Sequence, residues 1–151
     1  MGAVTLAVAA TTGCGMAHRA PRDGLAPNTA RFSYGERSVE MPVSGCGRQG
    51  HVFVAGGGRG TDVLQVAADL GSGGLDRSGV TAQVGGDGIF GAFGPDAPHG
   101  PAGEITGVHV DGDRLTVDGR WVPMDKNYVP TQAATIDGKL VVRCPQTKHP
   151  D

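Results

Sequence analysis

Glycine is spread along the whole chain and constrains its fold more than any other feature. It accounts for 27 of the 151 residues, whereas charged residues make up only 19%. A glycine inside a helix costs about 1 kcal/mol relative to alanine, so a helical bundle is disfavoured. Glycine suits tight turns, where it adopts positive φ without a steric cost. The composition therefore predicts one mainly β domain, an antiparallel sheet or sandwich of short strands.

The clearest predicted hairpins contain an Asp-Gly pair between two β-prone stretches. Asp111-Gly112 separates residues 105–110 from 115–121, and Asp137-Gly138 separates residues 133–136 from 140–144. Asp-Gly favours the two-residue turns that join antiparallel strands. In the last stretch, Leu140, Val142 and Cys144 share one face, which is expected to point inward. Further strands are predicted at 32–34, 39–43, 51–55, 80–84 and 89–93, with glycines 56–58 ending the third of these and a Pro/Gly loop at 94–103.

Residues 62–70 fit two kinds of structure. Val63, Val66, Ala67 and Leu70 recur at the i, i+3, i+4 and i+7 positions of a short helix. Thr61-Asp62 is a suitable N-cap, and Gly71 a suitable stop. The run Val-Leu-Gln-Val is also β-prone, so a strand remains the alternative.

The N-terminal stretch has the pattern of an export signal. Residues 1–13 carry no charge and contain a short apolar run, too short to span a bilayer, followed by Thr12, Gly13 and Cys14. Gly13-Cys14 resembles the end of the bacterial lipobox. In that motif the peptidase cuts before a cysteine whose thiol receives diacylglycerol, and the freed amino group takes a further acyl chain such as palmitate. We therefore expect residues 1–13 to be a lipoprotein signal peptide, truncated because no basic residue opens it, and Cys14 to be lipid-modified.

The remaining segments follow from composition. Residues 14–30 have no apolar periodicity and contain two prolines, so they are expected to be the lipidated cysteine and a flexible tether. The β-rich domain is predicted over residues 31–145, and residues 146–151 form a C-terminal tail.

The two other cysteines bracket this domain. Cys46 and Cys144 are expected to form a disulfide, because export places them in an oxidising compartment where such pairs persist. Closing a loop of about 100 residues contributes about 4.7 kcal/mol in the chain-entropy model. Two free buried cysteines are the alternative.

With these features, the chain resembles the mycobacterial nineteen-kilodalton lipoprotein antigen family. The resemblance rests on the lipobox cysteine, on the sequences ending in Cys46 and Cys144, on residues 114–121 and on the Ala/Val/Leu segment 63–70. It implies a cell-envelope lipoprotein, lipid-anchored on the extracytoplasmic face of the membrane. It also implies an antigen and agonist of a host innate lipopeptide receptor, without catalytic residues.

No motif predicts an active site, a metal site or a cofactor. The five histidines lack the spacing of zinc ligands, and His109 with Asp111 is best explained as a surface pair beside a turn. The net charge of −2 and the absence of a basic stripe argue against nucleic-acid binding.

Three hypotheses for function remain. The first is a non-enzymatic lipoprotein that displays its β domain at the envelope. The second is a carrier or binding module for lipid or a small hydrophobic ligand, with a pocket between the sheets lined by Phe90, Phe93, Trp121 and Tyr128. The third, a small exported hydrolase, would need convergent polar residues that the sequence does not suggest.

Overall fold

The computed structural model describes residues 24–144, except for residues 73, 97–102 and 132. It is mainly β, as predicted, with one short 3₁₀ helix, η1, at Gly74–Arg77. The nine strands are β1 (Thr29–Tyr34), β2 (Arg37–Gln49), β3 (Val52–Arg59), β4 (Asp62–Asp69), β5 (Gly79–Val84), β6 (Gly88–Phe93), β7 (Glu104–Asp111), β8 (Arg114–Met124) and β9 (Ile136–Arg143).

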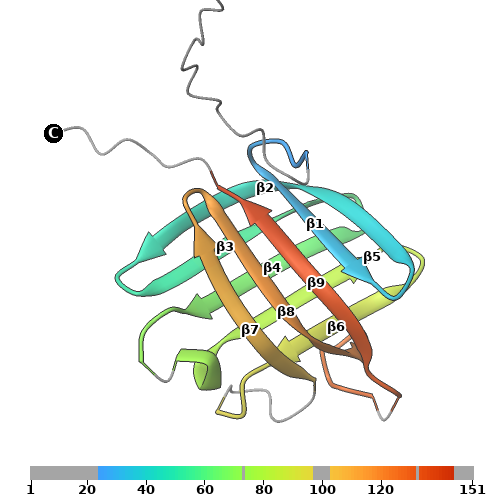
Figure 1. The fold of residues 1–151 in the computed structure, drawn as a ribbon. Helices are drawn as coiled ribbons and strands as arrows, with labels where there is room; N and C mark the ends of the chain where they lie inside the picture. The colour runs from blue at the N-terminus through green and yellow to red at the C-terminus, as the bar shows by residue number, and fades with distance from the viewer. Residues whose placement is uncertain (1–23, 73, 97–102, 132, 145–151) are drawn as a thin grey trace, which may run out of the picture.

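Eight of the strands close into an antiparallel barrel, and β7 is the extra one. The strand order is β6-β5-β4-β3-β2-β1-β9-β8-β7, and β8 also pairs with β6 through Ile89 opposite Met124. Strands β1, β9, β8 and β7 form one layer, and β3 to β6 form the layer behind it (Figure 1).

The two longest strands make the corners between these layers. The first half of β2 pairs with β1 and the second half with β3, with the register shifting between Val43 and Gly45. Strand β8 pairs with β7 and β9 over most of its length and with β6 only at its end. Switching partners at a bulge or bend is how one strand serves two packed sheets.

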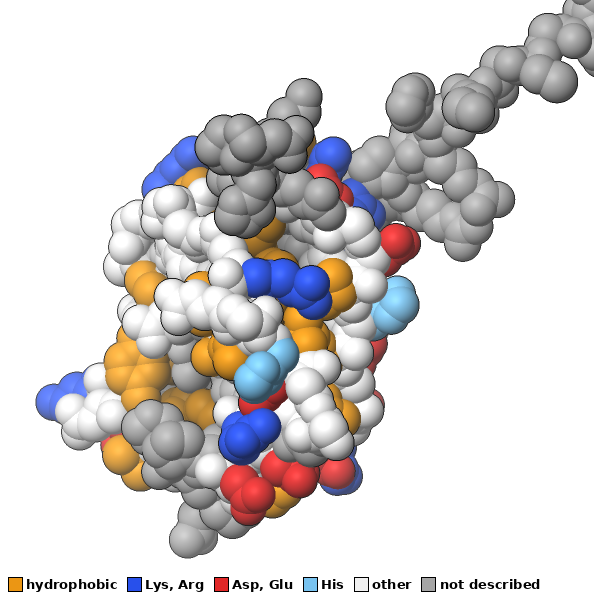
Figure 2. Space-filling view, turned by 90° about the vertical axis from the view of Figure 1, so that its left-hand side faces the viewer, with side chains coloured by type: hydrophobic (Ala, Val, Ile, Leu, Met, Phe, Trp, Pro, Cys, Tyr) orange, Lys and Arg blue, Asp and Glu red, His pale blue; other side chains and the backbone are white. Residues whose placement is uncertain are grey.

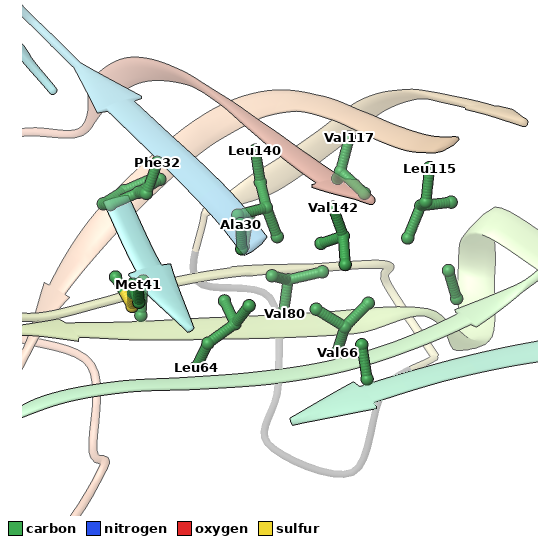
Figure 3. Close-up of a cluster of buried hydrophobic side chains, with 14 of the residues drawn as sticks. Ala30, Phe32, Met41, Leu64, Val66, Val80, Leu115, Val117, Leu140 and Val142 are labelled. Atoms are coloured by element: carbon green, nitrogen blue, oxygen red, sulfur yellow. The ribbon is translucent and has the colours of Figure 1, made fainter. Parts of the chain in front are cut away.

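The interior is filled by side chains from both layers. Leu140 and Val142 of β9 point toward Val80 of β5 and toward Leu64 and Val66 of β4 (Figure 3). Each fully buried side chain of this kind contributes about 1.5 to 3 kcal/mol. The predicted inward face of the last strand, Leu140, Val142 and Cys144, is confirmed, since all three are buried.

Residues 62–69 form strand β4, so the helix considered for 62–70 is wrong and the alternative of a strand is correct. Leu64, Val66 and Ala68 point into the core, whereas Gln65 and Ala67 are exposed. The pairing of β4 with β3 and β5 fixes this alternation of period two. The local helical spacing of valines and alanines is overridden by that pairing.

The second predicted hairpin is also wrong, although the Asp111-Gly112 hairpin is confirmed between β7 and β8. Asp137 and Gly138 lie inside β9, where Gly138 pairs with Gly119 and with Tyr34. A Cβ on Gly138 would lie 2.6 Å from Cδ1 of Trp121. This glycine therefore makes room for the indole ring and does not form a turn.

Glycines 56–58 likewise lie within β3 and do not end it. A Cβ on Gly57 would lie 2.3 Å from the carbonyl oxygen of Pro42, where β2 bends across β3. Here too glycine permits two backbones to approach closely.

The domain begins earlier than residue 31. Leu25 is buried, and β1 starts at Thr29. The predicted tether therefore overlaps the folded domain at its last residues. Cys14 and the predicted signal peptide lie outside the described residues, as does the tail 146–151.

Candidate functional site

The predicted disulfide joins Cys46 to Cys144, which are 98 positions apart in sequence and have their Cα atoms 5.7 Å apart. It lies just beyond the start of β1, where Thr29 pairs with Pro42 of β2 on one side and with Arg143 of β9 on the other. The bond therefore links β2 to the end of β9 at the point where the strand between them begins.

Further bonds tie the chain ends together beside the disulfide. Arg143 donates from Nη1 to the carbonyl oxygen of Leu25 over 2.9 Å and from Nε to Oδ2 of Asp113 over 2.8 Å. The backbone N–H of Cys144 donates to the carbonyl oxygen of Asp113. Both ends of the described chain thus lie at one end of the barrel (Figure 1).

The opposite end of the barrel holds an aromatic cluster. Phe32 packs against Tyr34, Phe90 and Trp121, with ring centroids 4.8, 6.0 and 4.5 Å away. The hydroxyl of Tyr34 donates to Asp87 in the turn between β5 and β6, and the same carboxylate pairs with Arg37. Burial and the neighbouring carboxylate raise the pKa of Tyr34 to about 12, while the bonds from Arg37 and Tyr34 lower the pKa of Asp87.

The four residues expected to line one ligand pocket are divided between two places. Phe90 and Trp121 are part of the filled core, and Trp121 is 0% exposed. Phe93 and Tyr128 lie outside the barrel, where both line a groove. The expected pocket between the sheets is therefore wrong, because inward-facing aromatic rings fill that space themselves.

The external groove has a volume of about 600 Å³. Its base is the outer surface of β4 and β5, with Ala67 and Gly79 among the lining residues. Phe93 and Met124 belong to a small second apolar cluster, with Ile89 and Val122, that packs outside the barrel. The loop after β8 supplies Asn127 and Tyr128 as one wall.

A buried carboxylate lies beside this groove. Oδ2 of Asp69 is 2.8 Å from Nη2 of Arg77, a groove residue, and Oδ1 accepts the backbone N–H of Gly71. His51 lies 3.4 Å from the same carboxylate. On the side of the barrel that carries η1, charged side chains of both signs and histidine lie among hydrophobic ones (Figure 2). The guanidinium of Arg77 thus has a fixed partner of opposite charge.

The groove was not predicted from the sequence. Its members come from five strands, from η1 and from the loop after β8, and no local pattern connects Gln65, Arg77 and Tyr128. One signal was available in the sequence of β6, Ile-Phe-Gly-Ala-Phe, which does not alternate between apolar and polar residues. A strand without such alternation is typically covered on both faces, which indicates that something packs on the outside of β6.

Among the described residues, no three His, Cys, Asp or Glu side chains gather as a metal site would require. Within the same part of the chain, no helix has the length and apolar character needed to cross a bilayer. His109 is exposed on β7 with Asp111, and His18, His99 and His149 lie outside the described residues.

Comparison with known proteins gives no match, either to the models of protein families or to curated sequences. The fold defines a small antiparallel β-barrel that carries one disulfide.

Proposed function

We propose that this chain is an exported, non-enzymatic lipoprotein, held at the extracytoplasmic face of the cell membrane by acyl chains on Cys14. The main support for the proposal is the way in which the three cysteines are divided between a disulfide and an unpaired position. Cys46 and Cys144 are joined to each other, which leaves Cys14, directly after an apolar run and the small residues Thr12 and Gly13. A disulfide between distant strands also suits an oxidising compartment, as export would provide.

Two or three acyl chains suffice for lasting attachment. Each buried CH₂ contributes about 0.8 kcal/mol, and a single chain gives only marginal, reversible binding. Several chains on one cysteine would therefore hold the barrel at the bilayer without a membrane-spanning segment.

The anchor also brings one end of the barrel toward the membrane. Gly24, the first described residue, lies ten residues after Cys14, and ten residues of extended chain reach at most about 35 Å. Leu25 lies against Arg143 at the end of the barrel that holds the disulfide. That end would face the membrane, and the end with Tyr34 and Asp87 would face away from it.

Detergent phase partitioning of the full chain, expressed in a bacterium with lipoprotein-processing enzymes, tests the proposal. We expect the unaltered protein in the detergent phase and Cys14→Ser in the aqueous phase. The Cys46→Ser/Cys144→Ser double variant is the matched control and should remain in the detergent phase. Recovery of Cys14→Ser in the detergent phase would exclude Cys14 as the anchor.

A further inference from the structure

The external groove on β4 and β5 has the chemistry of a carbohydrate site, and we propose that it binds an uncharged saccharide of one or two pyranose rings. Its volume of about 600 Å³ falls within the range of about 300 to 1,000 Å³ found for small-ligand sites. The floor, the wall and the rim of the groove each fit such a ligand, and none of them depends on the anchor at Cys14.

The floor is apolar where two small outward residues of neighbouring strands pair with each other. Ala67 of β4 and Gly79 of β5 both face out of the barrel. A Cβ on Gly79 would lie 3.1 Å from Cδ1 of Phe93, so the Phe93 ring lies over the backbone there and forms part of the floor. The apolar surface formed by Ala67 and the Phe93 ring matches the C–H face of a pyranose ring.

The wall is a loop that holds an aromatic ring in place. Oδ1 of Asp125 accepts the backbone N–H groups of Asn127 and Val129 over 2.8 and 2.9 Å. Thr131 then donates its hydroxyl and its backbone N–H to the carbonyl oxygen of Pro123, which closes the base of the loop. A ring on a fixed loop loses little conformational entropy when a ligand stacks on it.

Tyr128 is the residue of this loop that lines the groove, and its backbone is in the left-handed region. Its φ is 60°, a conformation that is uncommon for a bulky residue and that glycine adopts without steric cost. Tyr128 is 37% exposed, so burial of its ring does not explain why a tyrosine occupies this position. Residues held in such conformations cluster at binding sites. An exposed aromatic ring beside the groove is available to a ligand.

The rim of the groove is polar, which favours a sugar over an acyl chain as the ligand. Gln65, Thr81 and Asn127 line the groove and supply amide and hydroxyl groups that can both donate and accept hydrogen bonds. An acyl chain here would desolvate these groups without bonding them, which costs free energy. The hydroxyl groups at the edge of a sugar ring would bond them.

The charge around the groove favours an uncharged ligand. Arg77 lies on the rim, but the carboxylate of Asp69 is 2.8 Å from its guanidinium and is almost fully buried. The pair has no net charge, so an anion gains little from it. The contact with Asp69 uses one of the five N–H donors of the guanidinium, which leaves donors for a sugar hydroxyl.

The test is chemical-shift mapping by NMR of the oxidised protein with cellobiose and N,N′-diacetylchitobiose as probes. We expect saturable shifts at the amides of Gly79, Thr81, Asn127 and Tyr128, with a dissociation constant of about 1 mM for at least one probe. Tyr128→Ala should weaken binding by at least about tenfold. Ala67→Arg should abolish it by filling the groove from an exposed position.

Val129→Ala is the matched control, because Val129 is exposed in the same loop but does not line the groove. It should bind as the unaltered protein does, and each variant must give a folded spectrum. Shifts confined to other surfaces, or no shift with either sugar, would overturn the proposal. Tighter binding of decanoate at the same amides would overturn it in favour of an acyl-chain site.

Discussion

The hydroxyl of Tyr34 lies 2.5 Å from Oδ2 of Asp87, a residue 53 positions later in the chain. This hydrogen bond joins the end of β1 to the turn between β5 and β6, from opposite layers of the barrel. The disulfide fastens the other end of the barrel, between β2 and β9. Each end thus has a long-range contact that a substitution can remove without touching the other end.

Removing the Tyr34 hydroxyl should weaken the barrel without changing its fold. In Tyr34→Phe the ring still packs against Phe32 and Phe90, but Asp87 loses one donor. We expect a lower urea midpoint with an unchanged slope, since the surface exposed on unfolding stays the same. Ser38→Ala, which removes an exposed hydrogen bond between the hydroxyl groups of Ser33 and Ser38, is the control and should lower the midpoint less.

The same pair makes stability depend on pH at both extremes. The pKa of Tyr34 is raised from 10.0 to about 12. The contribution of its hydroxyl to the free energy of unfolding is therefore complete below pH 10 and is lost as the pH rises through about 12. The pKa of Asp87 is lowered from 3.8, so its contribution is present above pH 3.8 and is lost as the pH falls through the lowered value. Urea unfolding across both ranges should show a smaller alkaline loss in Tyr34→Phe. An equal loss in both proteins would contradict this assignment.

Breaking the disulfide should cost more than any single hydrogen bond. Its loop spans 98 positions, for which the chain-entropy model gives about 4 to 5 kcal/mol. We expect Cys46→Ser/Cys144→Ser to lose about 3 to 5 kcal/mol of unfolding free energy in urea. Cys14→Ser, compared in the same soluble form, should lose nothing. A double variant as stable as the unaltered protein would show that the barrel does not depend on this bond.

Gly138 should not tolerate a side chain. A Cβ there would lie 2.6 Å from Cδ1 of Trp121 and 2.9 Å from the carbonyl oxygen of Ser33. We expect Gly138→Ala to lose about 1 to 3 kcal/mol through overpacking. Gly107→Ala on β7 meets no atom within 4 Å and is the matched control. Thermal unfolding followed by circular dichroism measures both, and equal midpoints would refute the packing argument.

We expect the side chain of Tyr128 to contribute to saccharide binding and not to the stability of the fold. Replacing it by glycine relieves the left-handed backbone at φ 60°. We expect Tyr128→Gly to be as stable as the unaltered protein or up to about 1 kcal/mol more stable, while saccharide binding is lost. A clear loss of stability would mean that the ring serves the fold.

The sequence predicted the local features of this fold better than the long-range ones. Alternation identified most strands, and the positions of Cys46 and Cys144 identified the disulfide. The prediction was wrong where glycines were assigned to turns or strand ends. Gly57 and Gly138 instead allow a neighbouring backbone and the Trp121 ring to approach closely, and these contacts are visible only in the folded chain. The spacing of residues 62–70 was ambiguous for the same reason, since strand pairing decides between a helix and a strand.

Barrel closure and the groove were beyond the reach of sequence patterns. Closure depends on the pairing of Ile89 with Met124, which lie in strands separated by β7. The groove joins Gln65, Arg77 and Tyr128, which no repeat or motif connects. Contacts between distant segments follow from the packing of the whole chain and leave no periodic signal.

Intact mass spectrometry of the full chain, made in a lipoprotein-processing bacterium, decides whether Cys14 anchors this barrel. We expect a polypeptide that begins at Cys14 and carries diacylglycerol with or without a further acyl chain. A chain that keeps residues before Cys14, or one that begins there with an unmodified thiol, would contradict it.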